Sequence, residues 1–275
     1  PGFAWLENMQ NYSRMNNGPD YKDHRVKGGN PCLEQSLESY ELCCLVETFP
    51  SNHDSLEDYL KTLKYAYTYA KTVTLGKTHW PETNRVMLRN RRIGCSMSGL
   101  AQFISNKGLH ELRTWMTEGY DSIQELDTMY SDWLAVPKSV KTTSIKPSGT
   151  VSLLAGATPG MHYPEFGSED STLVVGIPVD VGEGIRTASE LSLWEQLSLA
   201  AFIQKYWADN QVSCTVTFDP ETEGDQIAPA LDYFQYQLKG ISFLPRLESG
   251  AYPQMPYESI DRETYNSMLS EVGKL

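Results

Sequence analysis

The 275-residue sequence predicts an α/β fold, because segments with helical periodicity alternate with segments that have the periodicity of strands. Apolar residues recur at three- and four-residue steps over residues 56–70, which indicates a helix capped by Asp54 or Ser55. Residues 191–207 have the same helical period, whereas residues 212–218 alternate between apolar and polar side chains, as a half-buried strand does. Neither a repeat nor a low-complexity linker divides the chain, so residues 1–275 are predicted to form one structural unit.

Four regions follow one another within this unit. A loop region that carries cysteines occupies residues 1–50, and residues 51–140 are mainly helical, with a first helix that ends near Gly76. Further helical patterns cover residues 109–118 and 122–134, with an interruption at Gly119. Residues 141–245 combine helices with short strands, which are predicted over residues 142–145, 150–154 and 173–181. Residues 246–275 are predicted to be an irregular tail with a short helix over residues 262–271.

Charge and composition exclude several classes of function. The formal net charge of −12 at pH 7 argues against generic binding to nucleic acid, which requires a basic face. No stretch approaches the roughly 18 apolar residues that cross a bilayer, and no secretory signal is evident, so we expect a cytoplasmic protein without a membrane partner. The odd number of five cysteines also fits a reducing compartment. No metal site is expected, because Cys43, Cys44 and His53 lack the spacing of structural zinc ligands.

An amide, a thiol and a carboxylate stand at alternate positions in Asn30, Cys32 and Glu34. Pro31 fixes its own φ angle and biases Asn30 away from helix, which favours an extended segment. Alternate side chains of an extended segment project from one face, so the three groups would form a compact reactive set. A surface loop with a chance cysteine is the alternative that these residues alone leave open.

The four other cysteines fall into two kinds. Cys95 and Cys214 lie in apolar patterns and are predicted to be buried and inert. Cys43 and Cys44 lie in the same region as Cys32, and two thiols near one another can exchange electrons by forming a disulfide. Local chemistry leaves open whether Cys43 or Cys44 has that role.

Residues 146–152 form a second candidate site. Gly149 would let backbone N–H groups approach an anion, and Ser148, Thr150 and Ser152 would add hydroxyl donors. The order of residues differs from that of a Walker A loop, so this is not a nucleotide-binding loop of that type. A tight turn between two strands is the alternative, which Pro147, Ser148 and Gly149 would serve equally well.

Several of these segments, taken in order, resemble the catalytic polypeptide of the monomeric, adenosylcobalamin-dependent ribonucleoside-triphosphate reductases. The resemblance runs through residues 30–43, 78–84, 91–94, 147–150 and 236–240 and covers nearly the whole chain. Separate motifs in one order are more specific than any single motif, so the chance-loop and plain-turn interpretations lose most of their weight. The fold that the resemblance implies is the second half of the family's ten-stranded α/β barrel, together with its central cysteine loop.

The resemblance implies the reduction of ribonucleoside triphosphates to 2′-deoxyribonucleoside triphosphates, for DNA synthesis, by thiyl-radical chemistry. Cys32 matches the thiyl position that takes the 3′ hydrogen, Glu34 the base at the 3′ hydroxyl, and Asn30 the amide that binds the sugar. Cys43 matches one thiol of the redox pair that reduces the 2′ carbon. The residues that match the loop around the substrate phosphates are Pro147, Ser148, Gly149, Thr150, Val151 and Ser152.

The resemblance also implies a cofactor and a reductant. Adenosylcobalamin would generate the radical, a thioredoxin-type protein would restore the thiols, and the enzyme would be a monomer. Two rivals remain: the large subunit of an iron-dependent reductase, and a non-catalytic remnant that still binds nucleotide. The short interval from Cys32 to Cys43 favours the cobalamin type, and the presence of Asn30, Cys32, Glu34 and Cys43 together argues against a remnant.

The chain departs from the family pattern in two places. No cysteine precedes Cys32, although the family's partner of Cys43 lies earlier in the polypeptide, and no cysteine pair follows Cys214. The chain therefore resembles a fragment, and we expect that these 275 residues alone form no deoxynucleotide.

Overall fold

The computed structural model describes residues 2–162, 178, 180, 182, 184–246 and 260–272. The strands are β1 (Gly2–Ala4), β2 (Gly28–Gly29), β3 (Ser36–Leu37), β4 (Leu45–Thr48), β5 (Gly94–Met97), β6 (Thr215–Phe218) and β7 (Gly240–Pro245). The helices are α1 (Leu6–Asn11), α2 (Leu56–Val73), α3 (Pro81–Asn90), α4 (Leu100–Leu134), α5 (Val151–Leu154), α6 (Leu193–Tyr206), α7 (Ile227–Phe234) and α8 (Arg262–Val272). Among the residues so described, no helix is both long and apolar enough to cross a membrane.

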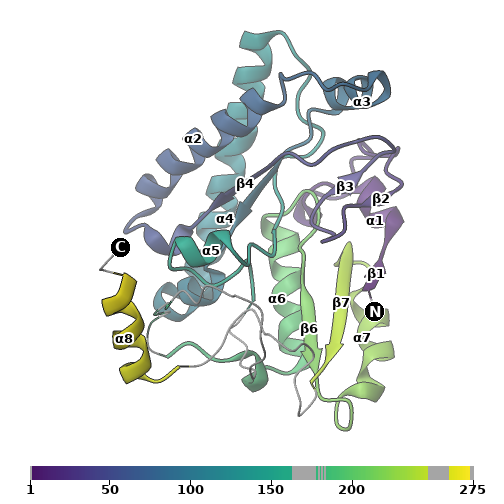
Figure 1. The fold of residues 1–275 in the computed structure, drawn as a ribbon. Helices are drawn as coiled ribbons and strands as arrows, with labels where there is room; N and C mark the ends of the chain where they lie inside the picture. Colours follow the sequence, from purple (N-terminus) through teal and green to yellow (C-terminus); the bar gives the residue numbers. More distant parts are fainter. Residues whose placement is uncertain are drawn as a thin grey trace.

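The parallel pairs β4–β5 and β6–β7 belong to separate sheets, which isolated parallel bridges connect (Figure 1). Strand β4 pairs with β5 in parallel, and a parallel bridge joins Cys95 of β5 to Thr143. A second parallel bridge joins Ile145 to Val212, just before β6, and β6 pairs with β7 in parallel. Strand β1 is antiparallel to β7. The order is therefore β4, β5, residues 142–145, the segment that leads into β6, and β7, which confirms the predicted α/β fold.

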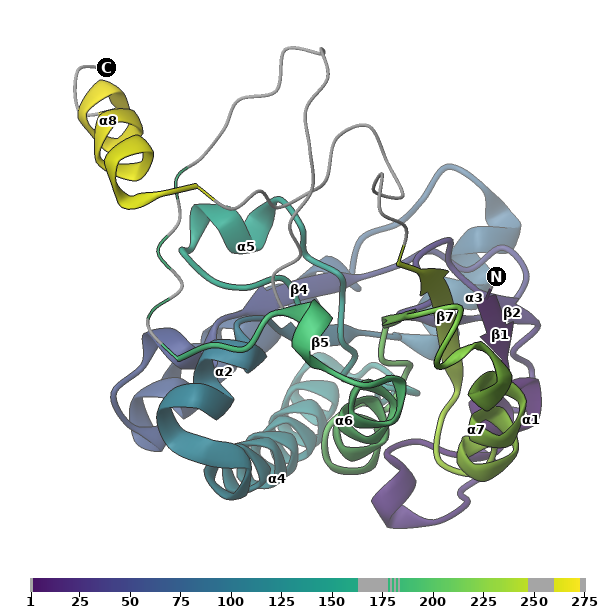
Figure 2. The ribbon, with the colours of Figure 1, turned by 90° about the horizontal axis from the view of Figure 1, so that it is seen from below.

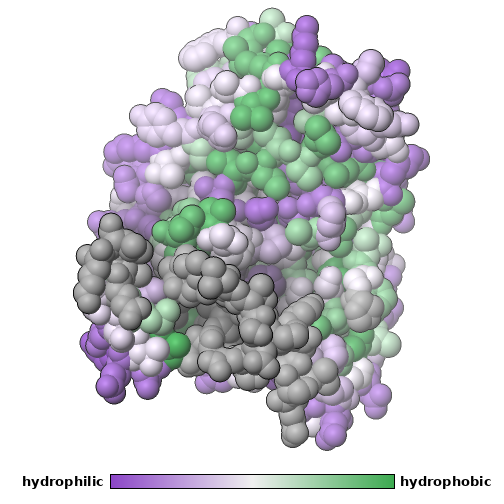
Figure 3. All heavy atoms as spheres, in the orientation of Figure 1, coloured by the Kyte–Doolittle hydropathy of each residue, from purple (hydrophilic) through white to green (hydrophobic). Residues whose placement is uncertain are grey.

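Helices α2, α4, α6 and α7 lie on one side of these strands, and α5 and α8 lie on the other (Figure 2). The helices bury large side chains against the strands, among them Tyr59 and Leu63 of α2 and Trp115 of α4. Apolar surface also gathers at the end of the molecule where α2 and α4 end (Figure 3), where Val73, Leu75 and Leu134 are exposed. The core thus lies on the helical side of the strands and leaves their other side to polar groups.

Helix α2 begins as predicted, and the structure selects Ser55 as its cap. The Ser55 side chain accepts a hydrogen bond from the backbone N–H of Asp58 at 3.3 Å. The predicted break at Gly119 is wrong, because α4 continues through it and is kinked at Gly108, whose φ is 83°. A Cβ at Gly119 would lie 2.9 Å from Leu63 Cδ1, so this glycine allows α4 to approach α2 closely.

Two predicted strands differ in the structure. Residues 150–154 are not extended, because the backbone N–H of Ser152 binds the carbonyl of Ser148 at 3.0 Å and starts the short helix α5. Residues 142–145 form isolated bridges rather than a named strand. Most of the strand predicted over residues 173–181 falls outside the described residues. The predicted helices over residues 191–207 and 262–271 are confirmed as α6 and α8.

Candidate functional site

Cys32 lies at the tip of a β-hairpin. Strands β2 and β3 pair antiparallel, with Gly28 opposite Leu37 and Gly29 opposite Ser36. One more backbone bond, from the N–H of Asn30 to the carbonyl of Gln35 at 3.2 Å, extends the ladder to the tip. Residues 30–35 therefore form a loop held at both ends.

The tip is a turn, so the prediction of an extended segment is wrong. The N–H of Leu33 binds the carbonyl of Asn30 at 2.9 Å, and Leu33 has a left-handed backbone with φ of 58°. Pro31 occupies the second position of this turn, for which its fixed φ is equally suitable. The expectation that Asn30, Cys32 and Glu34 share one face of an extended segment is therefore wrong. Whether their side chains lie close together depends on how the tip packs against the strands.

Residues far along the chain dock the tip onto the strands. The hydroxyl of Ser213 donates to the carbonyl of Cys32 at 2.6 Å, and the N–H of Gln211 donates to the carbonyl of Glu34 at 3.1 Å. The Leu33 side chain lies so close to Gly240 that any Cβ there would overlap it. The hairpin thus lies across the parallel strands and contacts the beginnings of β6 and β7.

Asn30, Cys32 and Glu34 at the tip each have a polar group that is exposed or unpaired. The Asn30 side-chain oxygen accepts from the N–H of Gln35 at 3.0 Å, and within the described part of the chain its amide nitrogen donates to nothing. Glu34 is buried at 1% exposure, yet its Oε2 atom has no hydrogen-bond partner among the residues that the structure describes. The Cys32 residue is exposed. A buried unpaired carboxylate oxygen is costly, which is typical of a group whose partner is a ligand.

Cys43 lies near this tip, whereas Cys44 points away from it. Partial burial raises the pKa of the Cys43 thiol, the charge of Glu34 raises it further, and Lys146 opposes these effects. Cys44 is buried, its thiol contacts the carbonyl of Ala70 in α2 at 3.5 Å, and burial raises its pKa to about 11. All five cysteines are free thiols, and Cys95 and Cys214 are buried as predicted.

The loop over residues 146–152 follows the bridged segment at 142–145. Ser148 is buried with a left-handed φ of 53°, and its hydroxyl has no hydrogen-bond partner within the described part of the chain. Gly149, Thr150 and Val151 are exposed, and their backbone N–H groups donate to no other described residue. This arrangement offers hydrogen-bond donors to an anion. Pro147 lines the same small cavity as Pro31, Cys32 and Leu33, which places the loop beside the hairpin.

Glu47 of β4 is a polar group that the sequence analysis did not single out. Its Oε1 atom accepts hydrogen bonds from the hydroxyls of Ser98 at 2.6 Å and Ser96 at 3.0 Å. Its Oε2 atom has no hydrogen-bond partner in the described segments. Burial raises the Glu47 pKa to about 7, and the charge of Glu34 contributes, while Lys146 opposes the shift. A lone carboxylate within the run Leu45–Thr48 was the signal that could have identified it.

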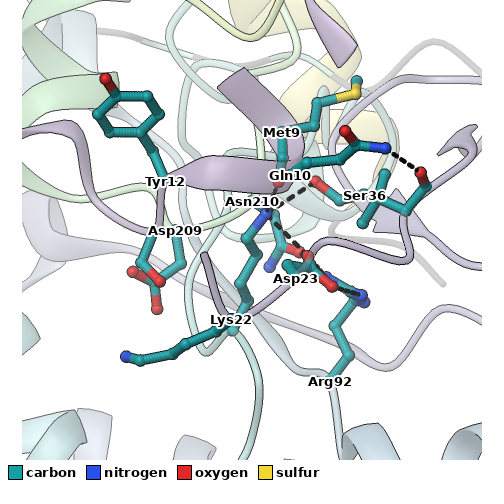
Figure 4. Close-up of polar contacts among 12 residues, drawn as sticks. Met9, Gln10, Tyr12, Lys22, Asp23, Ser36, Arg92, Asp209 and Asn210 are labelled. Atoms are coloured by element: carbon teal, nitrogen blue, oxygen red, sulfur yellow. Dashed lines mark hydrogen bonds and ion pairs between the residues drawn. The ribbon is translucent and has the colours of Figure 1, made fainter. Parts of the chain in front are cut away.

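A buried ionic network fixes the base of the hairpin. The carboxylate of Asp23 accepts two hydrogen bonds from the guanidinium of Arg92, at 2.6 and 2.7 Å. These two side chains face one another beside Ser36 (Figure 4). The Nζ atom of Lys141 lies 2.8 Å from Asp23 Oδ2 and donates a hydrogen bond to the hydroxyl of Ser36 in β3 at 3.2 Å. Arg92 also binds Glu41 at 3.0 Å, and all these charges are almost fully buried. The hairpin base is therefore held by paired charges in the interior.

A small cavity of about 180 Å³ adjoins the tip and is lined by Cys32, Leu33, Pro147 and residues at the starts of β6 and β7. Its walls bring the hairpin and the loop of residues 146–152 to one place. Within the residues that the structure describes, no cluster of three His, Cys, Asp or Glu side chains could hold a metal ion.

Comparison with known proteins gives relatives of one kind. No family model matches the chain. The chain is 62% identical over 304 residues to a probable adenosylcobalamin-dependent ribonucleoside-triphosphate reductase of Dictyostelium discoideum, with 99% of this chain and 40% of the relative covered. It is 58% identical over 302 residues to the adenosylcobalamin-dependent ribonucleoside-triphosphate reductase of Euglena gracilis, covering 99% and 41%. The chain thus spans about two fifths of the length of these relatives.

A solved structure gives the same result for the fold. A B12-dependent (class II) ribonucleotide reductase superposes with a TM-score of 0.84 at 30% identity, over 99% of this chain and 46% of that one. The class Id alpha subunit of Actinobacillus ureae superposes with a TM-score of 0.64 at 15% identity and shares the fold. The predicted fold is confirmed by the first of these matches.

Proposed function

We propose that this chain carries the radical hairpin of an enzyme that makes deoxyribonucleoside triphosphates for DNA synthesis. Over the segment that it spans, the chain belongs to the adenosylcobalamin-dependent ribonucleoside-triphosphate reductases. The observation that carries the proposal is the docked hairpin, which brings Cys32 and Glu34 near Cys43 and beside a loop suited to phosphate. The chemistry requires these groups around one ribose.

Each group has a task in this proposal. The Cys32 thiyl radical takes the 3′ hydrogen of the ribose, Glu34 accepts the proton of the 3′ hydroxyl through its unpaired Oε2, and the free amide of Asn30 holds the sugar. The 2′ hydroxyl then leaves as water, and two thiols reduce the 2′ carbon as they become a disulfide. Cys32 finally returns the hydrogen to the 3′ carbon, so its thiyl radical is restored.

Cys43 is one of the two reducing thiols in this proposal. Its exposure and its proximity to Glu34 and Cys32 support this choice over Cys44, whose buried thiol contacts α2. The second thiol would come from a part of the whole enzyme outside this chain, because the other candidates, Cys95 and Cys214, are buried in the core. A thioredoxin-type dithiol would reduce the disulfide again, in a monomeric cytoplasmic enzyme.

The triphosphate of the substrate would be held by residues 147–152. The exposed N–H groups of Gly149, Thr150 and Val151 and the unpartnered hydroxyl of Ser148 support this role. Backbone donors suit a phosphate because they are fixed by the loop and need no added positive charge. This matters in a chain with a net charge of −12.

The described residues are compatible with a cofactor that approaches Cys32 from outside the chain. Cys32 is exposed, so its thiol is accessible to a cofactor. Adenosylcobalamin, which the names of the relatives specify, would supply the radical that removes the hydrogen of the thiol. The task of this chain is to hold the sulfur in place.

The substitution Cys32→Ser in the full-length enzyme tests the proposal. Serine keeps the shape of the side chain, but its O–H bond is too strong to form the radical. We expect no deoxynucleotide formation by Cys32→Ser and unchanged binding of ribonucleoside triphosphate. Turnover by this variant would exclude Cys32 as the radical site, and full turnover by Cys44→Ser is the matched control.

A further inference from the structure

Glu47 holds together the two ends of the loop that approaches the cavity, through two serine hydroxyls. The Ser96 hydroxyl accepts from the backbone N–H of Lys146 at 2.8 Å and donates to Glu47 Oε1 at 3.0 Å. The Ser98 hydroxyl accepts from the backbone N–H of Gly160 at 2.9 Å and donates to the same Oε1 atom at 2.6 Å. One carboxylate oxygen is thus linked to the first and last residues of the segment 146–160.

The two ends also touch directly. Gly160 has a left-handed backbone with φ of 51°, and any Cβ there would overlap the carbonyl of Lys146. Glu47 and Ser96 lie opposite one another in the parallel pair of β4 and β5, so the strands themselves fix the relative position of carboxylate and hydroxyl. Both serines are fully buried, where a hydrogen bond to a carboxylate is stronger than in water.

We propose that Glu47, Ser96 and Ser98 form a loop clamp that positions the segment 146–160 against the Cys32 hairpin. This segment contains the proposed phosphate loop of residues 147–152. This inference rests on the proposed function, since it assigns the clamp to the same substrate. Glu47 is a positioning residue in it, because it acts through the serines and the backbone of the loop. Pro147, the second residue of the clamped segment, lines the same cavity as Cys32, so the segment reaches the tip of the hairpin.

Amide hydrogen exchange in the full-length enzyme tests the clamp without reference to activity. We expect faster exchange at both Lys146 and Gly160 in Glu47→Ala, at Lys146 in Ser96→Ala, and at Gly160 in Ser98→Ala. Glu47→Gln keeps an oxygen acceptor and should restore most of the protection. Ser144→Ala is the matched control, because Ser144 is a buried serine whose hydroxyl bonds to none of the described residues.

The steady-state constants test whether the clamp positions the substrate. Glu47→Ala is expected to raise KM for the ribonucleoside triphosphate about tenfold, with a smaller effect on kcat, and Glu47→Gln should recover much of the loss. Should Glu47→Ala fail to fold, the Ser96→Ala and Ser98→Ala pair gives the same test. Unchanged exchange at both amides, or faster exchange with an unchanged KM, would overturn the proposal.

Failure of the proposed function has a different signature. If the loop does not bind phosphate, Ser148→Ala will also leave KM unchanged, and this result would contradict the assignment of the loop. The exchange at Lys146 and Gly160 would still decide whether Glu47 holds the two ends together.

Discussion

The hydroxyl of Ser213 donates a hydrogen bond of 2.6 Å to the backbone carbonyl of Cys32. This bond fixes the main chain of the hairpin tip and does not engage the sulfur, which belongs to an exposed residue. The backbone position of Cys32 is thereby set by a segment that leads into β6, while the residue itself stays exposed.

Ser213→Ala should therefore impair catalysis more than stability. Losing one hydrogen bond leaves the Cys32 carbonyl unpaired and lets the tip move, for which we expect kcat to fall about five- to tenfold. Ser213→Thr, which keeps a hydroxyl, should retain most of the rate. Steady-state kinetics and thermal unfolding of the full-length enzyme check this expectation, and an unaltered kcat in Ser213→Ala would contradict it.

Gly240→Ala should displace Leu33. The added Cβ overlaps the Leu33 side chain, so we expect a loss of about 1–3 kcal/mol of unfolding free energy, as for other overpacked sites. Leu33→Ala removes the overlap, so the double variant should lose less than the sum of the two single variants. Urea unfolding of the four proteins measures this coupling, and strict additivity would show that the two residues do not press on one another.

Cys43→Ser and Cys44→Ser should differ in turnover. Without the Cys43 thiol the 2′ carbon has no complete pair of reductants, so deoxynucleotide formation should stop. The Cys44 thiol contacts the carbonyl of Ala70 in α2, away from the tip, so Cys44→Ser should keep turnover at a modest cost in stability. Quantifying product per enzyme separates the two, and loss of product in Cys44→Ser alone would reverse the assignment.

Arg92→Met should destabilise the protein strongly. Burial alone would lower the Arg92 pKa, but Asp23 and Glu41 raise it. The substitution removes the cation that binds the buried Glu41 and leaves the buried Asp23 with Lys141 alone. We expect a loss of about 3–5 kcal/mol. Arg89→Met breaks the partly exposed pair with Glu38 and should cost about 1 kcal/mol or less. Denaturant titration of both variants tests the contrast, which equal losses would refute.

Glu47 should make stability depend on pH. Burial is the main cause of its raised pKa of about 7, against 4.5 for an unperturbed carboxyl; Glu34 adds to the shift, and the hydroxyls of Ser96 and Ser98 and the charge of Lys146 oppose it. Between these two pH values the folded state binds more protons than the unfolded state, so stability falls as the pH rises. Glu47→Gln removes this titration and should gain stability relative to the wild type from about pH 4.5 to about pH 7. A difference that does not change with pH would contradict the shift.

The sequence was sufficient where a pattern is local. The three- and four-residue spacing before Ala70 and the alternation before Phe218 predicted α2 and β6, because burial of one face produces both patterns. Gly119 was misread as a break because a glycine needed for close packing against Leu63 has the same local signature as one that ends a helix.

The candidate site depends on contacts that no local pattern records. Pro31 suits an extended segment and a turn equally well, and the left-handed Leu33 that decides for the turn is held by the distant Gly240. The choice between Cys43 and Cys44 likewise required the position of α2. Glu47 was overlooked because its partners, Ser96 and Ser98, become neighbours only when β4 and β5 pair.

The bond between Ser213 and Cys32 joins residues that are 181 positions apart in the chain. At about 5–20 residues per second, a ribosome adds the second residue roughly 10 to 35 seconds after the first. Lys141, which binds Ser36 at the base of the hairpin, is already present by then, whereas the tip still lacks its partners Ser213 and Gly240. The base of the hairpin can therefore be anchored during synthesis before its tip is.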